Sequence, residues 1–217
     1  MDSITIVAMP AGKSNHPDTM ELWNLIDERG RPGADVVEVD RRIWERFGCR
    51  RAVMFTDLSG FSRQVEKFGI LHFLHVIHQQ RKLFFPLLAM HRGQILKEEG
   101  DSLMVVFDNI ADAFDCAVKM QHATVTHNAS LPPEEQVLLC VGLGFGDVLL
   151  IGNRDVWGRE VNVASKLGED TAKSGQILLS TAAMTALGDV PGISFQVIGQ
   201  GFTSTDRNFS ATYPPPR

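Results

Sequence analysis

The sequence predicts an α+β fold, because β-branched apolar runs alternate with amphipathic runs in the order β-α-β-β-α-β from residue 51 onward. This order is that of the split βαβ, ferredoxin-like plan, which has an antiparallel central sheet. Hydrophobic residues make up 44% of the 217 residues, which is enough for a packed core. Because this plan hosts many activities, the function must be argued from individual residues.

Residues 1–49 are predicted to form an N-terminal arm that leads into a core domain at 50–217. The arm contains a short helical pattern over 19–29, which ends at Gly30. A second helix is predicted over 36–47, where apolar residues form one stripe. Such a stripe is typical of a packing or dimerisation helix, and we favour that interpretation.

In the core, strands are predicted where short apolar runs are bounded by turn residues. They cover residues 52–56, 94–97, 103–107, 137–145, 148–151, 176–180, 194–198 and 209–212, and Gly146 separates the fourth from the fifth. Helices are predicted where apolar residues recur at helical spacing. They cover residues 63–67, 70–91, 109–127, 160–172 and 181–187. Pro86 is expected to kink the longest of these helices.

Composition and charge argue against several classes of protein. The net charge of −5 is unfavourable for a broad basic face, so no nucleic-acid partner is expected. The apolar stretches fall short of the roughly 20 residues that span a bilayer, and the N-terminus lacks the basic region of a signal peptide. Cys49, Cys116 and Cys140 are odd in number and widely spaced, which favours a reducing, cytoplasmic location over a disulfide framework.

Asp57 and Asp101 are the candidate metal ligands. Asp57 ends the first core strand and Asp101 precedes the third, and these strands are antiparallel neighbours in the predicted plan. Both carboxylates therefore fall at one edge of the sheet, where they repel each other unless a cation such as Mg²⁺ or Mn²⁺ lies between them. Singly, each aspartate is more often a helix cap or a turn residue. Their joint placement favours the metal site.

The segment that follows Asp57 is suited to binding phosphate. Leu58, Ser59, Gly60 and Phe61 lead from a strand into a helix start, where unpaired backbone N–H groups point toward an anion. Glycine at position 60 permits close approach of the backbone. Metal on the carboxylates and phosphate on these amides would together form one triphosphate site.

Three segments resemble the signature blocks of class III adenylyl and guanylyl cyclases. They are FTDLSGF at 55–61, KEEGDSLMVVF at 97–107 and DVWGREVNVASK at 155–166, and they occur in the order typical of the family. The resemblance implies the cyclase fold and a head-to-tail homodimer with composite sites that hold two Mg²⁺ or Mn²⁺ ions each. The implied reaction is attack of the ribose 3′-oxygen of ATP on the α-phosphate, which yields 3′,5′-cyclic AMP and pyrophosphate.

The resemblance also implies a division of roles between the two protomers. Asp57 and Asp101 of one protomer would hold the metal ions, while Lys97 and Asp155 of the other would bind the base. Lysine is a pure hydrogen-bond donor and suits adenine N1, whereas ionised aspartate is a pure acceptor and suits the adenine amino group. Guanylyl members typically carry Glu and Cys at these two places, so the pair favours ATP.

The catalytic cations depart from the family pattern. Asn162 matches the asparagine that orients the ribose, and Lys166 shares its helix face but stands where the family usually has arginine. Lysine lacks the planar fork that binds two phosphate oxygens. Gln200 occupies the place of a phosphate-contacting lysine, for which Arg207 is a speculative substitute. Arg154 is the nearby candidate for a triphosphate-binding arginine, in a loop shorter than usual.

These departures leave three hypotheses open. The first is an active, homodimeric adenylyl cyclase, in which weakened cationic contacts lower turnover because each such contact contributes a few kcal/mol to the transition state. The second is a catalytically weak nucleotide-binding module with a regulatory or dimerisation role. The third is another phosphoryl-transfer enzyme on a palm-like fold, and the segment around Asn162 argues against it.

Overall fold

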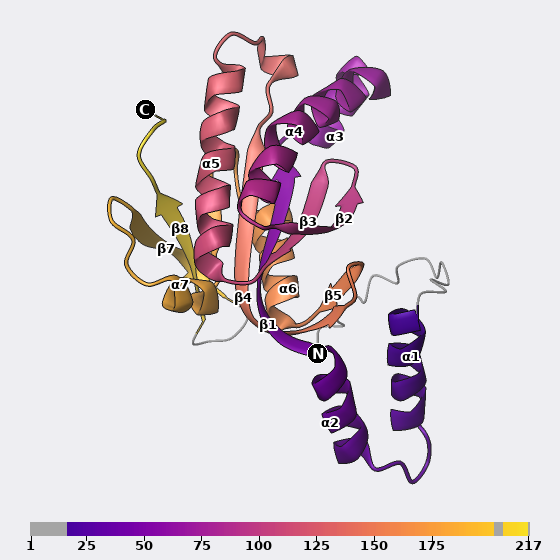
Figure 1. The fold of residues 1–217 in the computed structure, drawn as a ribbon. Coiled ribbons are helices and arrows are strands. Elements are labelled where there is room, and N and C mark those ends of the chain that lie inside the picture. The colour runs from indigo at the N-terminus through magenta and orange to yellow at the C-terminus, as the bar shows by residue number, and fades with distance from the viewer. Residues whose placement is uncertain (1–16, 202–205, 217) are drawn as a thin grey trace. The chain divides into compact units, whose positions relative to one another are not determined.

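A computed structural model describes residues 17–201 and 206–216, without the side chains of 61–64. The chain divides into a unit that ends at Arg46 and a larger unit that begins at Phe47 (Figure 1). The division of the sequence into an arm at 1–49 and a cyclase homology domain at 50–217 stays a prediction. Among the described residues, no helix is both long and apolar enough to span a bilayer.

The smaller unit is a pair of helices, α1 (Pro17–Arg29) and α2 (Val36–Phe47). Both were predicted from the sequence, and α1 begins two residues earlier than expected because Pro17 suits the first turn of a helix. Exposed ion pairs connect the helices, among them Arg42 with Glu28 at 2.6 Å. Pairs of this kind contribute less than about 1 kcal/mol each, so the apolar side chains between the helices carry more of the stability.

The larger unit is built on a mixed sheet with the strand order β2-β3-β1-β4-β6-β8-β7, in which β5 pairs with β4. The β4–β6 pair is parallel and the other pairs are antiparallel. The strands are β1 (Gly48–Leu58), β2 (Gln94–Glu99), β3 (Ser102–Phe107), β4 (Leu139–Ile151), β5 (Asp155–Trp157), β6 (Ile177–Leu179), β7 (Ser194–Gln200) and β8 (Arg207–Thr212). The predicted ferredoxin-like arrangement of the first four strands is confirmed.

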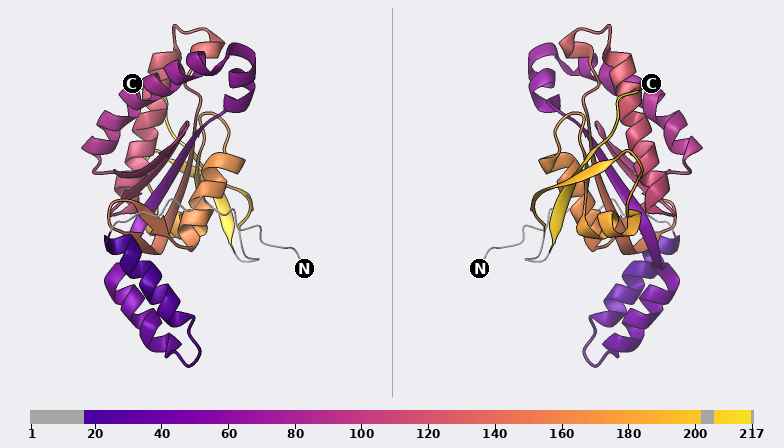
Figure 2. Two further views of the ribbon diagram at one scale, coloured as in Figure 1. Left: turned by 90° about the vertical axis from the view of Figure 1, so that its right-hand side faces the viewer. Right: turned by 90° about the vertical axis from the view of Figure 1, so that its left-hand side faces the viewer.

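The helices cover both faces of this sheet, with α4 and α5 on one face and α6 on the other (Figure 2). Their bounds are α3 (Phe61–Phe68), α4 (Ile70–Met90), α5 (Ile110–Asn128), η1 (Pro133–Glu135), α6 (Arg159–Ser165), η2 (Lys166–Thr171) and α7 (Thr181–Leu187). Strand residues alternate between the two faces, so β1, β2, β3 and β4 each contribute to two separate apolar layers.

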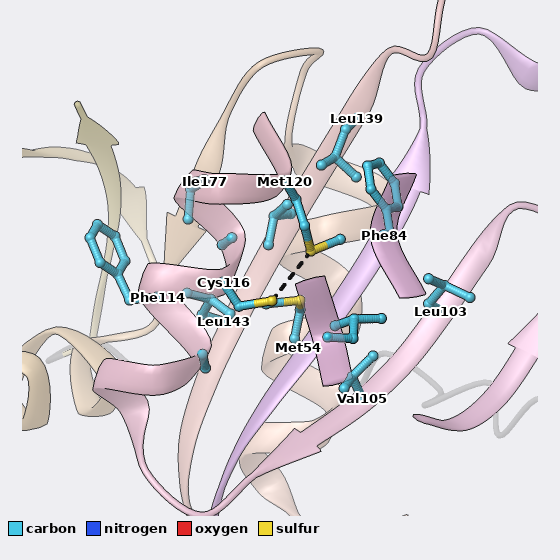
Figure 3. Close-up of a cluster of buried hydrophobic side chains, with 14 of the residues drawn as sticks. Met54, Phe84, Leu103, Val105, Phe114, Cys116, Met120, Leu139, Leu143 and Ile177 are labelled. Carbon is cyan, nitrogen blue, oxygen red and sulfur yellow. Dashed lines mark hydrogen bonds between the residues drawn. The ribbon is translucent and has the colours of Figure 1, made fainter. Parts of the chain in front are cut away.

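The larger apolar layer lies between the sheet and helices α4 and α5 (Figure 3). Strand side chains meet helix side chains there, among them Met54, Leu103, Val105, Leu139, Leu143, Phe84, Phe114 and Met120. The thiol of Cys116 donates to the sulfur of Met120 at 3.8 Å within this layer. Close packing on this side gives the strands that carry the site a rigid support.

Two predictions about the elements were wrong, and one strand was not predicted. The strand expected to break at Gly146 runs without interruption as β4, because it pairs with β1 along its length and Gly146 lies opposite Arg51. The helix expected over 160–172 is α-helical only to Ser165 and continues as the π-helix η2. Strand β5 was not predicted from the sequence, and it forms because residues 155–157 fold back along β4 and pair with it.

Candidate functional site

Asp57 and Asp101 lie together at one edge of the sheet. Strands β1 and β3 are antiparallel with Thr56 opposite Leu103, so Asp57 stands beside the turn that carries Asp101. The backbone N–H of Leu58 donates to Oδ2 of Asp101 at 3.2 Å. The convergence expected from the sequence is therefore present.

Burial and mutual repulsion characterise this pair of carboxylates. Burial and the nearby charge of Asp101 raise the pKa of Asp57 to about 7. Burial likewise raises the pKa of Asp101, and the charge of Glu169 acts in the same direction on both groups. A cation bound between the two carboxylates would favour their ionised forms and so lower both pKa values.

The backbone after Asp57 forms the start of α3. Gly60 has a φ of 86°, a left-handed conformation that favours glycine, and α3 begins at Phe61. The N–H of Ser59 donates to the carbonyl of Leu138 at 2.9 Å, and the N–H of Leu58 donates to Asp101. Two of the four amides expected to face phosphate thus have partners within the chain. The side chain of Phe61 lies outside the described residues.

Lys97 and Asp155 form an ion pair across β2 and β5. The Lys97 Nζ atom lies 2.8 Å from Oδ1 of Asp155, and both side chains are partly buried. The same carboxylate oxygen accepts from the N–H of Val156 at 2.8 Å. The two residues that the sequence assigned to base recognition are therefore brought together within one chain.

Asn162 is exposed on α6, and Lys166 is the exposed residue that directly follows this helix. Their neighbours Val161, Val163 and Ala164 are buried against the sheet, so the pair faces away from it. This agrees with the expectation that residues four apart share a helix face.

The remaining candidates lie in the turn between β4 and β5 and at the facing ends of β7 and β8. Arg154 is exposed in the turn between β4 and β5, where its backbone N–H donates to the backbone carbonyl of Ile151 at 3.2 Å. Gln200 and Arg207 are directly opposite each other in the β7–β8 pair. Arg207 therefore occupies the cross-strand place nearest to the glutamine that interrupts the family pattern.

Comparison with known proteins decides the family. The sequence model of the "Adenylate and Guanylate cyclase catalytic domain" family matches residues 48–208. The chain belongs to this family. A putative adenylate cyclase 3 of Rhizobium meliloti is 30% identical over 129 residues, and an adenylate cyclase of Mycobacterium tuberculosis is 32% identical over 139 residues. These matches cover 59% and 58% of the chain but only 22% and 31% of the two relatives.

Solved cyclase structures share the fold of the larger unit. An adenylate/guanylate cyclase/hydrolase from Silicibacter pomeroyi superposes with a TM-score of 0.65 at 26% identity, over 77% of this chain and 98% of its own. The adenylyl cyclase CyaB from P. aeruginosa gives a TM-score of 0.64 at 22% identity, over 77% and 95% of the two chains. The second likeness concerns the fold alone.

The carboxylate pair of this cyclase domain fits a divalent cation. Family members use divalent metals, and two partly buried, mutually repelling carboxylates provide the hard oxygen ligands that Mg²⁺ and Mn²⁺ prefer. Within the described part of the chain, no group of three His, Cys, Asp or Glu residues could hold a metal ion. The rest of a coordination shell would thus come from backbone, water and substrate phosphate, as is usual for Mg²⁺.

One residue that supports this carboxylate pair was not predicted from the sequence. Gln80 of α4 is 1% exposed, and its side-chain amide donates to the backbone carbonyl of Asp101 at 2.8 Å. A signal was present, because Gln80 lies at helical spacing from the buried Phe73 and Phe84. A polar residue within an apolar stripe indicates a buried hydrogen bond.

Proposed function

We propose that this chain is an adenylyl cyclase that converts ATP to 3′,5′-cyclic AMP and pyrophosphate at composite sites of a head-to-tail homodimer. The observation that carries the proposal is the convergence of Asp57 and Asp101 at one sheet edge in a chain of the cyclase family. We also propose a cytoplasmic location, because the odd number and wide spacing of Cys49, Cys116 and Cys140 favour a reducing compartment.

In this proposal, Asp57 and Asp101 hold two Mg²⁺ or Mn²⁺ ions per site. When bound, these ions neutralise phosphate charge and acidify the ribose 3′-hydroxyl. The backbone from Leu58 to Phe61 lies beside the carboxylates at the start of a helix, and it orients the triphosphate. The positions of the carboxylates and of this backbone favour a substrate whose reacting atom is a phosphorus.

The base is recognised by Lys97 and Asp155. Because they already form an ion pair, a base that enters must exchange with it, donating its amino hydrogen to Asp155 and accepting from Lys97 through a ring nitrogen. Adenine offers that pattern, whereas guanine offers the opposite one. This pair supports ATP over GTP.

The second protomer supplies Asn162, which orients the ribose, and Lys166, which stabilises the charge that develops in the transition state. Arg154 adds a further cation to the triphosphate. A composite site of this kind explains why Asn162 and Lys166 face away from their own sheet, where a second chain can reach them.

The test is an assay of the purified protein with ATP or GTP, each with Mg²⁺ or Mn²⁺. We expect cyclic AMP from ATP, less cyclic GMP from GTP, and at least about 100-fold loss of activity in Asp57→Ala. Cyclase activity that survives Asp57→Ala would contradict the metal assignment.

A catalytically weak nucleotide-binding module is the second candidate, and it is favoured by lysine at position 166 and glutamine at position 200. It predicts saturable binding of ATP with no cyclic product under any of the four conditions. The same assay, combined with calorimetric titration of ATP, therefore distinguishes the two functions.

A further inference from the structure

Glu160 is a buried carboxylate that the proposed chemistry does not use. It lies in the first turn of α6 and is 5% exposed. Its Oε2 atom accepts from the hydroxyl of Ser180 at 2.6 Å and from the backbone N–H of Phe145 at 3.3 Å. Its Oε1 atom accepts from the guanidinium of Arg159 at 3.2 Å. A carboxylate this deeply buried is costly unless such partners surround it, so its position calls for a physical explanation.

The bond to Phe145 lies just beyond the point where β6 stops pairing with β4. Strand β6 pairs with β4 only up to Leu179, and the N–H of Ser180 then donates to the carbonyl of Leu143 at 2.9 Å. Beyond this point the chain turns into α7, whose N-cap is Ser180. Where β6 has ended, Glu160 accepts a hydrogen bond from the backbone N–H of Phe145. It also accepts one from the hydroxyl of Ser180, the N-cap of α7. One carboxylate thus connects α6, β4 and α7.

Helix α6 packs closely on β4. Gly142, Gly144 and Gly146 lie on one face of β4; backbone atoms of α6 lie over the first two, and the side chain of Glu160 lies over Gly146. A Cβ atom at Gly142 would lie 2.2 Å from the carbonyl oxygen of Ala164, and one at Gly144 would lie 2.4 Å from that of Glu160. Beside this row, Val161 and Ala164 of α6 pack in one apolar cluster with Val53, Phe55 and Val148 of the sheet. Apolar contacts have no preferred direction, so the directional hydrogen bonds of Glu160 add a more specific constraint on the position of α6 along β4.

Glu160 faces the sheet, while Asn162 and Lys166 face away from it. At a rise of about 1.5 Å per residue, Asn162 is only ~3 Å farther along the axis of α6 than Glu160. Any slide of α6 along the glycine row would move Asn162 and Lys166 by the same distance.

We propose that Glu160 is a positioning residue, which locks α6 at one place along β4 through Ser180 and Phe145 and so places Asn162 and Lys166 for the reaction. The inference rests on the proposed function for its catalytic consequence but not for the anchoring of α6. A displacement of about 1 Å in a reacting group lowers turnover by up to about 100-fold.

The experiment compares Glu160→Ala and Glu160→Gln with Gln121→Ala. Gln121 is a matched control, since it is 2% exposed and its amide donates to the carbonyls of Leu139 and Gln176, but it belongs to α5 on the opposite face of the sheet. The readouts are hydrogen exchange of the amides at 159–165, kcat and KM with ATP, and binding of a non-reactive ATP analogue.

For Glu160→Ala we expect exchange at 159–165 to accelerate at least about 10-fold and kcat to fall by about 10- to 100-fold, while analogue binding changes less than about 3-fold. Glu160→Gln keeps an acceptor for Ser180 and Phe145, so the exchange rate at 159–165 and kcat should both stay within about 3-fold of those of the unmodified chain. Gln121→Ala should lower Tm without accelerating this exchange and without lowering kcat. If Glu160→Ala does not fold, Ser180→Ala is measured instead, with the same expected direction.

Equal exchange rates at 159–165 in Glu160→Ala and Gln121→Ala would overturn the anchoring role. Accelerated exchange without a fall in kcat would overturn the positioning role. If the unmodified chain forms no cyclic nucleotide, the proposed function fails, and the exchange comparison still decides whether Glu160 anchors α6.

Discussion

Lys97 Nζ lies 2.8 Å from Oδ1 of Asp155, so a pure hydrogen-bond donor and a pure acceptor meet where β2 approaches β5. Both side chains are partly buried, so separating them costs free energy unless each finds another hydrogen-bond partner. A base that accepts from Lys97 and donates to Asp155 provides both partners.

Exchange of both members of this pair should alter base preference. In the double variant Lys97→Glu with Asp155→Cys, the glutamate accepts from the guanine ring N–H and amino group, and the thiol donates to its carbonyl. The ratio of kcat/KM for ATP to that for GTP should fall by at least about 100-fold. Lys119→Glu, which makes the same charge change as Lys97→Glu on an exposed face of α5, is the control and should leave the ratio unchanged. An unaltered ratio in the double variant would count against base recognition.

The ionised Asp57 should destabilise the metal-free protein at neutral pH. Its pKa in the folded state is about 7, above the ordinary value of 3.8, so the folded state binds the proton more tightly than the unfolded state. The stability that this proton provides is therefore complete below pH 3.8 and is lost as pH rises through 7. After allowance for screening by water at this half-buried site, the loss is about 1–2 kcal/mol.

Asp57→Asn should remove most of the loss of folding stability that accompanies ionisation of Asp57. We expect the metal-free variant to unfold at a higher denaturant concentration than the unmodified chain at pH 8, and to show no stabilisation by Mn²⁺. The measurement is urea unfolding at pH 5.5 and pH 8, with and without Mn²⁺. Asp108→Asn, an exposed carboxylate with the same charge change, serves as the control. If the free energy of unfolding depends more steeply on pH in Asp57→Asn than in the unmodified chain, ionisation of Asp57 is not the cause of the destabilisation.

Gln80→Leu should weaken both the fold and the metal site. The substitution leaves the backbone carbonyl of Asp101 without the amide that now donates to it, and a buried unsatisfied acceptor costs about 1–3 kcal/mol. The turn that carries Asp101 should loosen, and the Kd for Mn²⁺ should rise about 10-fold. Urea unfolding and titration of Mn²⁺ measure the two effects. Gln79→Leu, on the exposed side of the same helix turn, should change neither.

Lys166→Arg should raise turnover if the weakened cation limits the reaction. The planar guanidinium can bind two phosphate oxygens at once, which the ammonium group cannot do. We expect kcat to rise about 3- to 10-fold with KM nearly constant, because the contact strengthens mainly in the transition state. Steady-state kinetics with ATP is the measurement, and Lys173→Arg is the exposed control. A fall in kcat would show that this chain is adapted to lysine.

The sequence alone determined the order of the core elements and the meeting of Asp57 with Asp101. Each element is marked by local periodicity, and antiparallel pairing of two neighbouring strands is enough to bring their ends to one edge. Lys97, Asp155 and Asn162 were assigned roles only because their segments resemble the signature blocks of the cyclases.

Only the tertiary structure decided which polar groups are buried together. The contact between Lys97 and Asp155 depends on β5 folding back along β4 and on a register shift in β2, and neither leaves a local pattern. The partners of Gln80 and Glu160 come from distant parts of the chain. Burial of a polar side chain is decided by every element that packs around it, so its partners cannot be read from its neighbours in sequence.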